Sequence, residues 1–470
     1  MVADDGVGQG RRGSHGVQHK GAILRALSGR RPRGLHSGIP LGRGGLGYTS
    51  ALFSWFAMTA CGIDFGTSNS TVGWMRPGQH ALLALEDGRP TLPSAIFFHD
   101  EDDEVSYGRA AIADYVAGYD GRLMRSMKSL LGSSLMEGHT EVAGRALPFK
   151  VLLTRFIAEL KARAEAAAGR GFEAAVLGRP VFFVDDNAKA DQLAEDTLGE
   201  IARAVGLREI AFQYEPLAAA FDYESQITRE ELVLVIDIGG GTSDFSLIRL
   251  GPQRAGRADR REDILAHGGV HIGGTDFDKQ LSMAHVMPLF GLGGQLKTGK
   301  DVPSTQYANL ACWHTINQAY TRKAAETFAF IQAQAVERDK IGHLMTLIKN
   351  REGHWVAIQV EEAKIALSEA PSTRIDLARI APRLAADIDR PAFDLSMNGL
   401  IDRIETTVAR LLADAGVSAV DTLFFTGGSS RVPCLRERVS ALLPGARSVE
   451  GDLFGSIGAG LALDARRKFG

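Results

Sequence analysis

The 470-residue chain has little of several features that mark particular classes of protein. Its three cysteines, Cys61, Cys312 and Cys434, lie far apart and form no Cys-x-x-Cys pair, so neither a zinc ribbon nor a disulfide framework is indicated. No run of about 18 apolar residues occurs, which argues against a transmembrane helix. The net charge of −3 provides no basic field for nucleic acid. These absences favour a cytoplasmic protein that has neither a membrane nor a nucleic acid as its partner.

Two familiar signatures of nucleotide binding are also missing. No Gly-x-x-x-x-Gly-Lys-Ser/Thr occurs, which excludes a P-loop. No Gly-x-Gly-x-x-Gly follows the first expected strand, so a dinucleotide-binding fold is not indicated. Any phosphate site must therefore be built from other turns.

Residues 1–57 differ in composition from the rest of the chain. They are rich in Gly and Arg, contain eight lysines and arginines against two aspartates, and show no apolar periodicity. Such a segment forms no packed core, and its apolar run at 51–58 is too short for a signal peptide. Because Met58 directly precedes the first expected strand, we interpret residues 1–57 as a mis-annotated upstream extension, with a disordered basic arm as the alternative.

From Met58 onward, short apolar runs alternate with helical stretches, which predicts an α/β core. Strands are expected at 60–63, 70–75, 181–184, 210–212, 232–236 and 422–425. Helices are expected at 147–168, 193–205, 216–220, 360–367, 400–412, 435–443 and 457–468. Two lobes are expected, because the chain exceeds the size at which one core usually keeps growing. The polar segment 285–357 is interpreted as a mainly helical elaboration.

Two segments of the chain resemble each other. Residues 63–70 read Ile-Asp-Phe-Gly-Thr-Ser-Asn-Ser, and residues 236–245 read Ile-Asp-Ile-Gly-Gly-Gly-Thr-Ser-Asp-Phe. Their first aspartates, Asp64 and Asp237, are 173 positions apart. Each segment predicts a strand, a glycine-bearing turn and a returning strand, so we infer an internal repeat with one copy in each lobe.

The chemistry of these turns points to phosphate. Glycine lets a turn approach a ligand closely, and successive N–H groups form a donor site for anions. The hydroxyls of Thr67, Ser68 and Thr242 would add donors. Since a carboxylate repels phosphate, Asp64 and Asp237 imply a Mg²⁺ ion held largely through water. A carboxylate can also orient or deprotonate an attacking water.

A third glycine turn, Thr426-Gly-Gly-Ser-Ser-Arg431, follows an expected strand and precedes an expected helix. Its N–H groups can meet an anion, and the planar guanidinium of Arg431 can stack on a base. Alone such a turn is ordinary loop chemistry. As the third in one chain, it favours part of a nucleotide site.

With these turns, four further segments resemble the ATPase domain of the DnaK-type, seventy-kilodalton heat-shock chaperones, and most of all their YegD-like branch. The segments are Tyr-Glu-Pro-Leu-Ala-Ala-Ala at 214–220, His-Ile-Gly-Gly-Thr-Asp-Phe-Asp at 271–278, Glu-Glu-Ala-Lys-Ile-Ala-Leu-Ser at 361–368 and Lys-Ser-Leu-Leu-Gly at 128–132. The resemblance covers residues 58–470. It implies the actin-like two-lobed ATPase fold, in which two ribonuclease-H-like domains enclose a nucleotide cleft.

The resemblance also implies a domain organisation. Lobe I would span 58–230 and be completed by about 452–470. Lobe II would span 231–451, including a helical elaboration around 285–395. We expect no peptide-binding domain after Gly470, so the family's best-known mode of client binding would not operate in this chain alone.

Site residues are implied one by one. Catalytic roles around the metal and the attacking water fall to Asp64, Glu215, Asp237, Thr242 and Asp244. The phosphate turns would be lined by Gly66, Thr67, Ser68, Asn69, Gly239, Gly240, Gly241, Gly273 and Gly274. The adenosine would be surrounded by Glu361, Lys364, Ser368, Gly427, Gly428, Ser429, Arg431 and Asp452. The cofactors would be ATP or ADP with Mg²⁺. As alternatives, Glu361 and Lys364 would be a solvated helical ion pair, and Glu215 would only cap a helix.

Two positions depart from the family pattern. The family places a phosphate-contacting lysine after a Gly-x-Ala-Ala run, but here the run at 108–111 is followed by Ile112. Lys128 and Arg109 are the candidates to replace it. Ile365 stands where the family usually has an arginine beside the base. We therefore expect slow hydrolysis or weakened nucleotide binding.

The expected function is that of an ATP-binding, slowly ATP-hydrolysing, chaperone-related protein with client proteins or co-chaperones as partners. Two alternatives stay open. One is a sugar kinase on the same fold, and the other is a nucleotide-binding scaffold or filament protein with little hydrolysis.

Overall fold

The computed structural model describes residues 59–101, 104–184, 187–257, 260–313, 315–452 and 455–470. The interpretation of residues 1–57 lies outside these described residues. Within the described part of the chain, no helix combines the length and the apolar character needed to cross a membrane.

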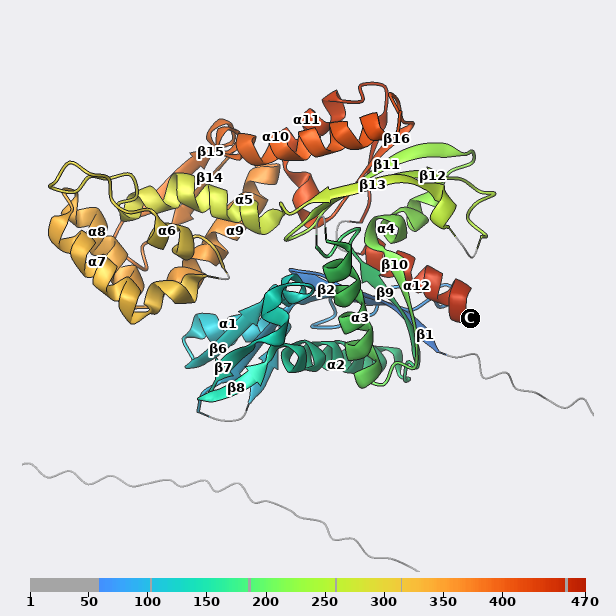
Figure 1. The fold of residues 1–470 in the computed structure, drawn as a ribbon, viewed down its shortest axis with the longest axis horizontal. Helices are drawn as coiled ribbons and strands as arrows, with labels where there is room; N and C mark the ends of the chain where they lie inside the picture. The colour runs from blue at the N-terminus through green and yellow to red at the C-terminus, as the bar shows by residue number, and fades with distance from the viewer. Residues whose placement is uncertain (1–58, 102–103, 185–186, 258–259, 314, 453–454) are drawn as a thin grey trace, which may run out of the picture. The chain divides into compact units, whose positions relative to one another are not determined.

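The first of two five-stranded sheets contains the first repeat segment (Figure 1). Its order is β10-β9-β1-β2-β3, formed by Glu209–Tyr214, Ala174–Arg179, Ala60–Phe65, Asn69–Gly73 and Thr91–Pro93. Strands β1 and β2 form an antiparallel hairpin, whereas β9 and β10 run parallel to β1. Side chains of β1 and β9 are buried on both faces, which explains their apolar runs.

Helices cover both faces of this sheet. Helices α2 (Phe149–Ala168) and α3 (Ala188–Ala204) share a core with Ile63 and Leu177. On the other face, Val176 packs with α4 (Glu215–Glu224) and α12 (Ser456–Phe469). The approach of α12 is so close that a Cβ on Gly62 would lie 2.3 Å from the backbone nitrogen of Ala462.

The second sheet repeats the topology of the first. Its order is β17-β16-β11-β12-β13, formed by Arg447–Glu450, Thr422–Thr426, Glu231–Ile238, Ser243–Leu250 and Ile264–Val270. Again the first two strands in sequence, β11 and β12, form an antiparallel hairpin, and β16 and β17 run parallel to β11. The sequence repeat is thus a repeat of structure, which confirms the predicted actin-like fold with duplicated domains.

Helices also cover the second sheet. Helix α4 packs on one face against Val233 and Val235. The other face packs against α5 (Gly274–Leu281), α10 (Arg390–Asp414) and α11 (Pro433–Ala441). Helix α4 contributes to the cores of both sheets, and residues of α12 also pack in both, so these two helices join the repeats.

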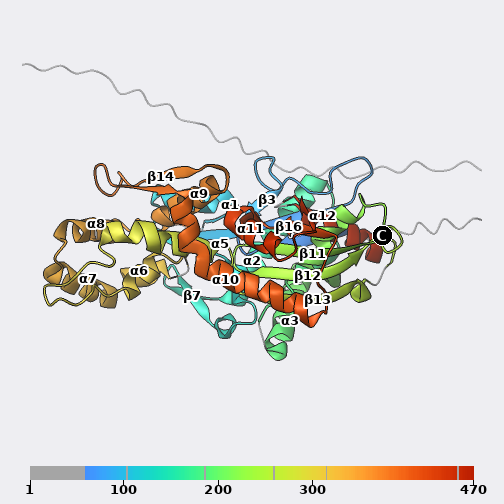
Figure 2. The ribbon, with the colours of Figure 1, turned by 90° about the horizontal axis from the view of Figure 1, so that it is seen from above.

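Each repeat carries further elements. The first adds α1 (Gly108–Ala117) and strands β4 (Ala95–His99), β5 (Val105–Tyr107), β6 (Gly121–Arg125), β7 (His139–Val142) and β8 (Arg145–Pro148). The second adds α6 (Thr305–Leu310), α7 (Arg322–Gln334), α8 (Arg338–Lys349), α9 (Gly353–Glu369) and the hairpin of β14 (Ser372–Asp376) and β15 (Ala385–Asp389). Both views show α6, α7 and α8 together, beyond α5 and away from the two sheets (Figures 1 and 2).

One predicted strand is wrong. Residues 181–184 form no strand, and the sheet uses the preceding run of small residues, β9. The N–H of Val181 donates to Asp244 at 3.3 Å, and the N–H of Phe183 donates to Asp191 at 2.6 Å. Side chains, rather than a neighbouring strand, therefore satisfy the backbone of this apolar run.

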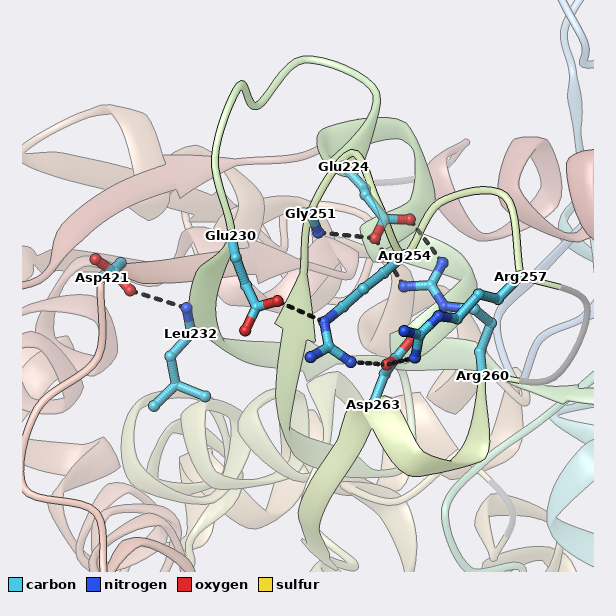
Figure 3. A network of polar contacts seen from close by, with 9 residues as sticks. All are labelled: Glu224, Glu230, Leu232, Gly251, Arg254, Arg257, Arg260, Asp263 and Asp421. Carbon is cyan, nitrogen blue, oxygen red and sulfur yellow. Dashed lines mark hydrogen bonds and ion pairs between the residues drawn. The ribbon is translucent and has the colours of Figure 1, made fainter.

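A buried network of charges ties the end of α4 to the connection between β12 and β13 (Figure 3). Arg260 donates to both oxygens of Glu224 at 2.7 Å and pairs with Asp263, and each of these side chains is 1% exposed. Arg254 joins the network by donating to Asp263 and Glu230. Because these buried charges are paired, the network fixes this corner of the second sheet against α4.

Candidate functional site

A cleft with a cavity volume of about 210 Å³ gathers predicted site residues from both repeats. Those that line it are Asp64, Gly66, Thr67, Ser68, Asn69, Glu215, Asp237, Gly239, Gly240, Thr242, Asp244, Gly274, Glu361, Lys364, Gly427, Gly428 and Ser429. Five predicted residues are not among its lining residues, namely Gly241, Gly273, Ser368, Arg431 and Asp452. Residues 173 positions apart in the chain therefore share one cleft.

The tips of the two repeat hairpins touch each other. A Cβ on Gly240 would lie 2.1 Å from Ser68 Oγ, and a Cβ on Gly241 would lie 3.4 Å from Thr67 Cγ2. A side chain at position 240 would have to displace the Ser68 hydroxyl, so glycine favours this approach of the two turns, both of which line the cleft.

The segment 271–278 packs directly behind the second turn. The N–H of Gly274 donates to Gly239 O at 2.9 Å, and that of Thr275 donates to Gly240 O at 2.8 Å. A Cβ on Gly273 would lie only 2.5 Å from Gly241 N. Gly241 and Gly273 thus bring two backbones together, which explains why neither lines the cleft.

The third turn lines the cleft and packs against the second hairpin. Gly427 has a φ of 78°, and a Cβ there would lie 2.5 Å from Asp237 Oδ1 and 2.4 Å from Ile238 O. A side chain at this position would therefore be strained and would also collide with the second hairpin. Parallel pairing of β16 with β11 sets this contact, since Asp237 lies opposite Thr426.

Four carboxylates converge beside these turns. Asp64, Glu215, Asp237 and Asp244 are 5–8% exposed. Lys128, which begins one of the family-like segments and is a candidate for the missing lysine, lies among them with its Nζ 2.5 Å from Glu215 Oε1. Glu215 is thus a buried cleft residue as well as the first residue of α4. Negative charge exceeds positive charge at this end of the cleft.

The pKa values reflect this excess. Burial, reinforced by Glu215, raises the pKa of Asp64 to about 7, although Lys128 opposes the shift. Burial and Glu215 raise the pKa of Asp244 to about 6, against a hydrogen bond from Thr242. Burial and the neighbouring carboxylates also raise the pKa of Asp237 well above its usual value. An added cation would relieve the repulsion that these shifts express.

Asp237 also has an unsatisfied acceptor. Its Oδ1 atom is buried and has no hydrogen-bond partner, and such atoms are rare unless a ligand, ion or water is bound. Within the described residues, no three His, Cys, Asp or Glu side chains are grouped as direct ligands of one metal ion. Asp64 and Asp237, the two residues predicted to bind the metal ion, line the same cleft.

Helix α9 supplies further lining residues of the cleft. Lys364 is 8% exposed, with its Nζ 2.8 Å from Asp278 Oδ1 and 3.2 Å from Gly274 O. It is therefore not part of a solvated helical ion pair. Glu361 lies one turn earlier and pairs with Arg125 of β6 at 3.6 Å. Ile365 also lines the cleft and is 58% exposed.

Three residues predicted to contact adenosine have other partners. Ser368 donates its hydroxyl to Lys364 O at 3.2 Å. Arg431 donates to Glu450 at 3.1 Å and to Glu369 at 3.4 Å. The carbonyl of Asp452 accepts hydrogen bonds at the start of α12. Their roles toward adenosine stay predictions.

The structure separates the two candidates for the missing lysine. Arg109 donates to Glu86 and to Thr91, and it does not line the cleft. Ile112 packs on the apolar cluster around Phe97. Of the two cations, Lys128 is the one that lines the cleft together with the glycine turns.

The duplicated sheets and the glycine-lined cleft define an actin-like nucleotide-binding fold. A family model described as "Hsp70 protein" matches residues 60–155, 152–309 and 345–464. These matches cover well over half of the chain, and the chain belongs to the Hsp70 family.

Curated relatives agree with this assignment. "Chaperone protein HscA" of Citrobacter koseri is 28% identical over 430 residues, which cover 86% of this chain and 58% of the relative. The protein of the same name from Salmonella typhimurium is 27% identical over the same shares. The chain thus spans less than two thirds of the length of these relatives. The resemblance to the heat-shock chaperones is confirmed, whereas the YegD-like branch stays a prediction.

Proposed function

We propose that the chain binds Mg²⁺-ATP in this cleft, hydrolyses it slowly to ADP and phosphate, and acts as a nucleotide-switched chaperone-related protein. The observation that carries the proposal is the meeting of two glycine hairpins, one from each repeat, beside the carboxylates Asp64 and Asp237. A single repeat would offer only half of such a clamp.

The residues present fit a magnesium-bound triphosphate. Glycines at 66, 240 and 427 line the cleft, and they lie so near other protein atoms that a Cβ at these positions would come within 2.5 Å of them. The unpartnered oxygen of Asp237 and the raised pKa values of its neighbours call for a cation. Asp64 and Asp237 would hold Mg²⁺ largely through water, because that ion keeps several of its waters. The ion would supply charge neutralisation at the phosphates.

The remaining carboxylates would act on water. Glu215 and Asp244 face the same space, and Asp244 is oriented by Thr242, whose hydroxyl donates to it at 2.9 Å. A carboxylate held in this way can orient an attacking water or accept a proton from it. Catalysis would then come mainly from positioning and charge stabilisation.

Lys128 would supply the cation that the family expects after the Gly-x-Ala-Ala run. Its ammonium is already paired with Glu215, so less of its charge is free for the phosphates. Slow hydrolysis is the expected consequence. On the adenosine side, Glu361, Lys364 and the 427–429 turn would bind the nucleoside, and Ile365 would offer the base an apolar edge.

The domain assignment fits this proposal. Lobe I would comprise 58–230 with 452–470, and lobe II would comprise 231–451. ATP would favour closure of the lobes, and hydrolysis would release them. Client proteins or co-chaperones would respond to that change, in keeping with the relatives being chaperones.

Calorimetric titration with Mg²⁺-ATP tests the proposal, and the absence of any binding heat at high nucleotide concentration would count decisively against it. Asp237→Asn should lower hydrolysis far more than binding. Asp387→Asn is the matched control, because it makes the same chemical change at an exposed residue of β15 that does not line the cleft. Equal losses of binding and hydrolysis in Asp237→Asn would contradict its role. Phosphate transfer that requires an added sugar would support the kinase alternative, and ATP-dependent sedimentation would support the filament.

A further inference from the structure

Ser94, between β3 and β4, is bound to the first glycine turn (residues 66–69) by two hydrogen bonds. Its hydroxyl donates to Gly66 O at 2.7 Å, and its N–H donates to Ser68 O at 2.9 Å. Ser94 is 1% exposed and does not line the cleft. One buried residue outside the cleft therefore holds two carbonyl groups of this turn.

A second buried serine fixes the direction of the Ser94 hydroxyl. Ser70 in β2 is fully buried, and its Oγ lies 2.9 Å from Ser94 Oγ. A hydroxyl has one hydrogen to donate and two lone pairs to accept with. Because the hydrogen of Ser94 is used in the bond to Gly66 O, Ser70 must donate to Ser94. The bond from Ser70 thus keeps the Ser94 hydroxyl aimed at the turn.

The second glycine turn (residues 239–242) is held in a similar way by the first turn of α5. Thr275 donates both its N–H and its hydroxyl to Gly240 O, each at 2.8 Å. Gly274 donates its N–H to Gly239 O at 2.9 Å. The first N–H groups of a helix have no acceptor within the helix, so α5 uses them to bind this turn. Each repeat therefore has one hydroxyl residue that donates its N–H and its hydroxyl to its own glycine turn.

These bonds decide where the N–H groups of the turns point. In a trans peptide the C=O and the N–H of one unit point in opposite directions. Bonds to the carbonyls of residues 66, 239 and 240 therefore turn the N–H groups of Thr67, Gly240 and Gly241 away from Ser94 and α5. Within the part of the chain that the structure describes, these three N–H groups donate to no protein acceptor. They stay available to an anion.

We infer that Ser94 and Thr275 are positioning residues that aim the N–H groups of the two glycine turns at the phosphates, one residue for each repeat. The inference rests on the proposed function and adds to it the side chains that orient the phosphate donors. Neither hydroxyl needs to touch the nucleotide, because each acts through a carbonyl of its turn. Without these hydroxyls the peptide units could rotate, and only the fraction of molecules with correctly directed N–H groups would bind.

Calorimetric titration of the full chain with Mg²⁺-ADP tests the role of Thr275. Thr275→Val removes the hydroxyl and keeps the volume, whereas Thr275→Ser keeps the hydroxyl and loses a methyl group. Affinity should fall about three- to tenfold in Thr275→Val, the range expected for one hydrogen bond. Affinity in Thr275→Ser should stay within about twofold of the native value. A residue that only filled space would give the opposite order.

Ser94→Ala tests the other repeat by the same titration, and its affinity should also fall about three- to tenfold. Because Ser94 does not line the cleft, this loss must act through the turn. Thr407→Val is the matched control. The Thr407 hydroxyl also donates to a backbone carbonyl, Arg403 O at 2.9 Å, but it belongs to α10 and does not line the cleft. Its affinity should stay within about twofold of the native value.

The outcomes separate the inference from the proposed function. If the native chain binds no Mg²⁺-ADP, the proposed function fails. If the native chain binds and either Ser94→Ala or Thr275→Val, folded by circular dichroism, keeps the native affinity, the positioning role of that residue alone is overturned. An equal loss in Thr275→Ser and Thr275→Val, or a similar loss in Thr407→Val, would also overturn the inference, because the effect would then reflect general loosening. Should Ser94→Ala not fold, the two Thr275 variants still decide.

Discussion

Replacing Lys128 by methionine tests the electrostatics of the cleft. Lys128 lies 2.5 Å from Glu215, and both side chains are about one-tenth exposed. Removing one partner of a buried ion pair typically costs 3–5 kcal/mol, because the remaining charge is left unpaired. Asp64 and Asp244 would lose a neighbouring positive charge as well. We expect Lys128→Met to lower the free energy of unfolding by about 3–5 kcal/mol near pH 8 in EDTA.

The loss should depend on pH in a defined direction. The pKa values of Asp64 and Asp244 are raised to about 7 and about 6, mainly by burial. A carboxyl group whose pKa is higher in the folded than in the unfolded protein stabilises the fold when the pH is below its unfolded-state pKa, about 3.9 for Asp. That stabilisation is lost as the pH rises through the folded-state pKa. Without Lys128 both pKa values rise further. Near pH 5.5 the carboxyl groups of Asp64 and Asp244 are then largely protonated and no longer need the positive charge of Lys128. The loss of unfolding free energy in Lys128→Met should therefore be about half of that near pH 8.

Urea unfolding followed by circular dichroism measures these differences at both pH values. Lys150→Met is the matched control, because Lys150 pairs with Glu200 at the same 2.5 Å but both side chains are at least half exposed. That exposed pair should contribute less than about 1 kcal/mol. A loss for Lys128→Met of under about 1 kcal/mol near pH 8, or an equal loss at both pH values, would refute the reasoning.

Three other substitutions probe separate parts of the structure. In Gly273→Ala the new Cβ would lie 2.5 Å from Gly241 N and would push the second glycine turn out of place. The affinity for Mg²⁺-ADP, measured by calorimetry, should therefore fall at least about tenfold, and an unchanged affinity would contradict this. Burial lowers the pKa of His354 to about 3, so its neutral form stabilises the fold and that stability is lost as pH falls below about 6.5. Between about pH 6 and 4, the native chain should lose about 1.4 kcal/mol per pH unit more than His354→Gln, and parallel curves would argue against the assignment. Arg260→Met removes the charged partner of the buried Glu224, whereas Asp263 keeps its pair with Arg254, and the change should cost about 3–5 kcal/mol in urea unfolding. The exposed Arg374→Met should cost under about 1 kcal/mol, and equal effects would disprove this.

Sequence patterns succeeded where the required chemistry is local. The segments around Asp64 and Asp237 each carry a strand, a glycine turn and a returning strand, and both hairpins are present. The same reasoning failed at 181–184, where an apolar run typical of a strand lies in a loop. Its backbone is bound by Asp191 and Asp244, and neither contact has a local signal.

The position of Lys128 shows a second feature that sequence patterns do not predict. Its sequence context resembles a lobe-one segment of the family, but nothing near it indicates a carboxylate partner 87 positions away. Arg109, the other candidate cation, is drawn to Glu86 and Thr91 instead. Packing of β6, α4 and the two repeat hairpins decides between them.

The glycine turns, the repeat and the family could be predicted from the amino-acid sequence, because glycine, aspartate and hydroxyl residues specify a turn within a few positions. Which charges meet, and that Tyr115 contacts His354 across 239 positions, depends on how the folded chain packs. Such contacts join residues that have no local influence on each other. They form only where two separately specified sheets, and the helices upon them, pack into one cleft.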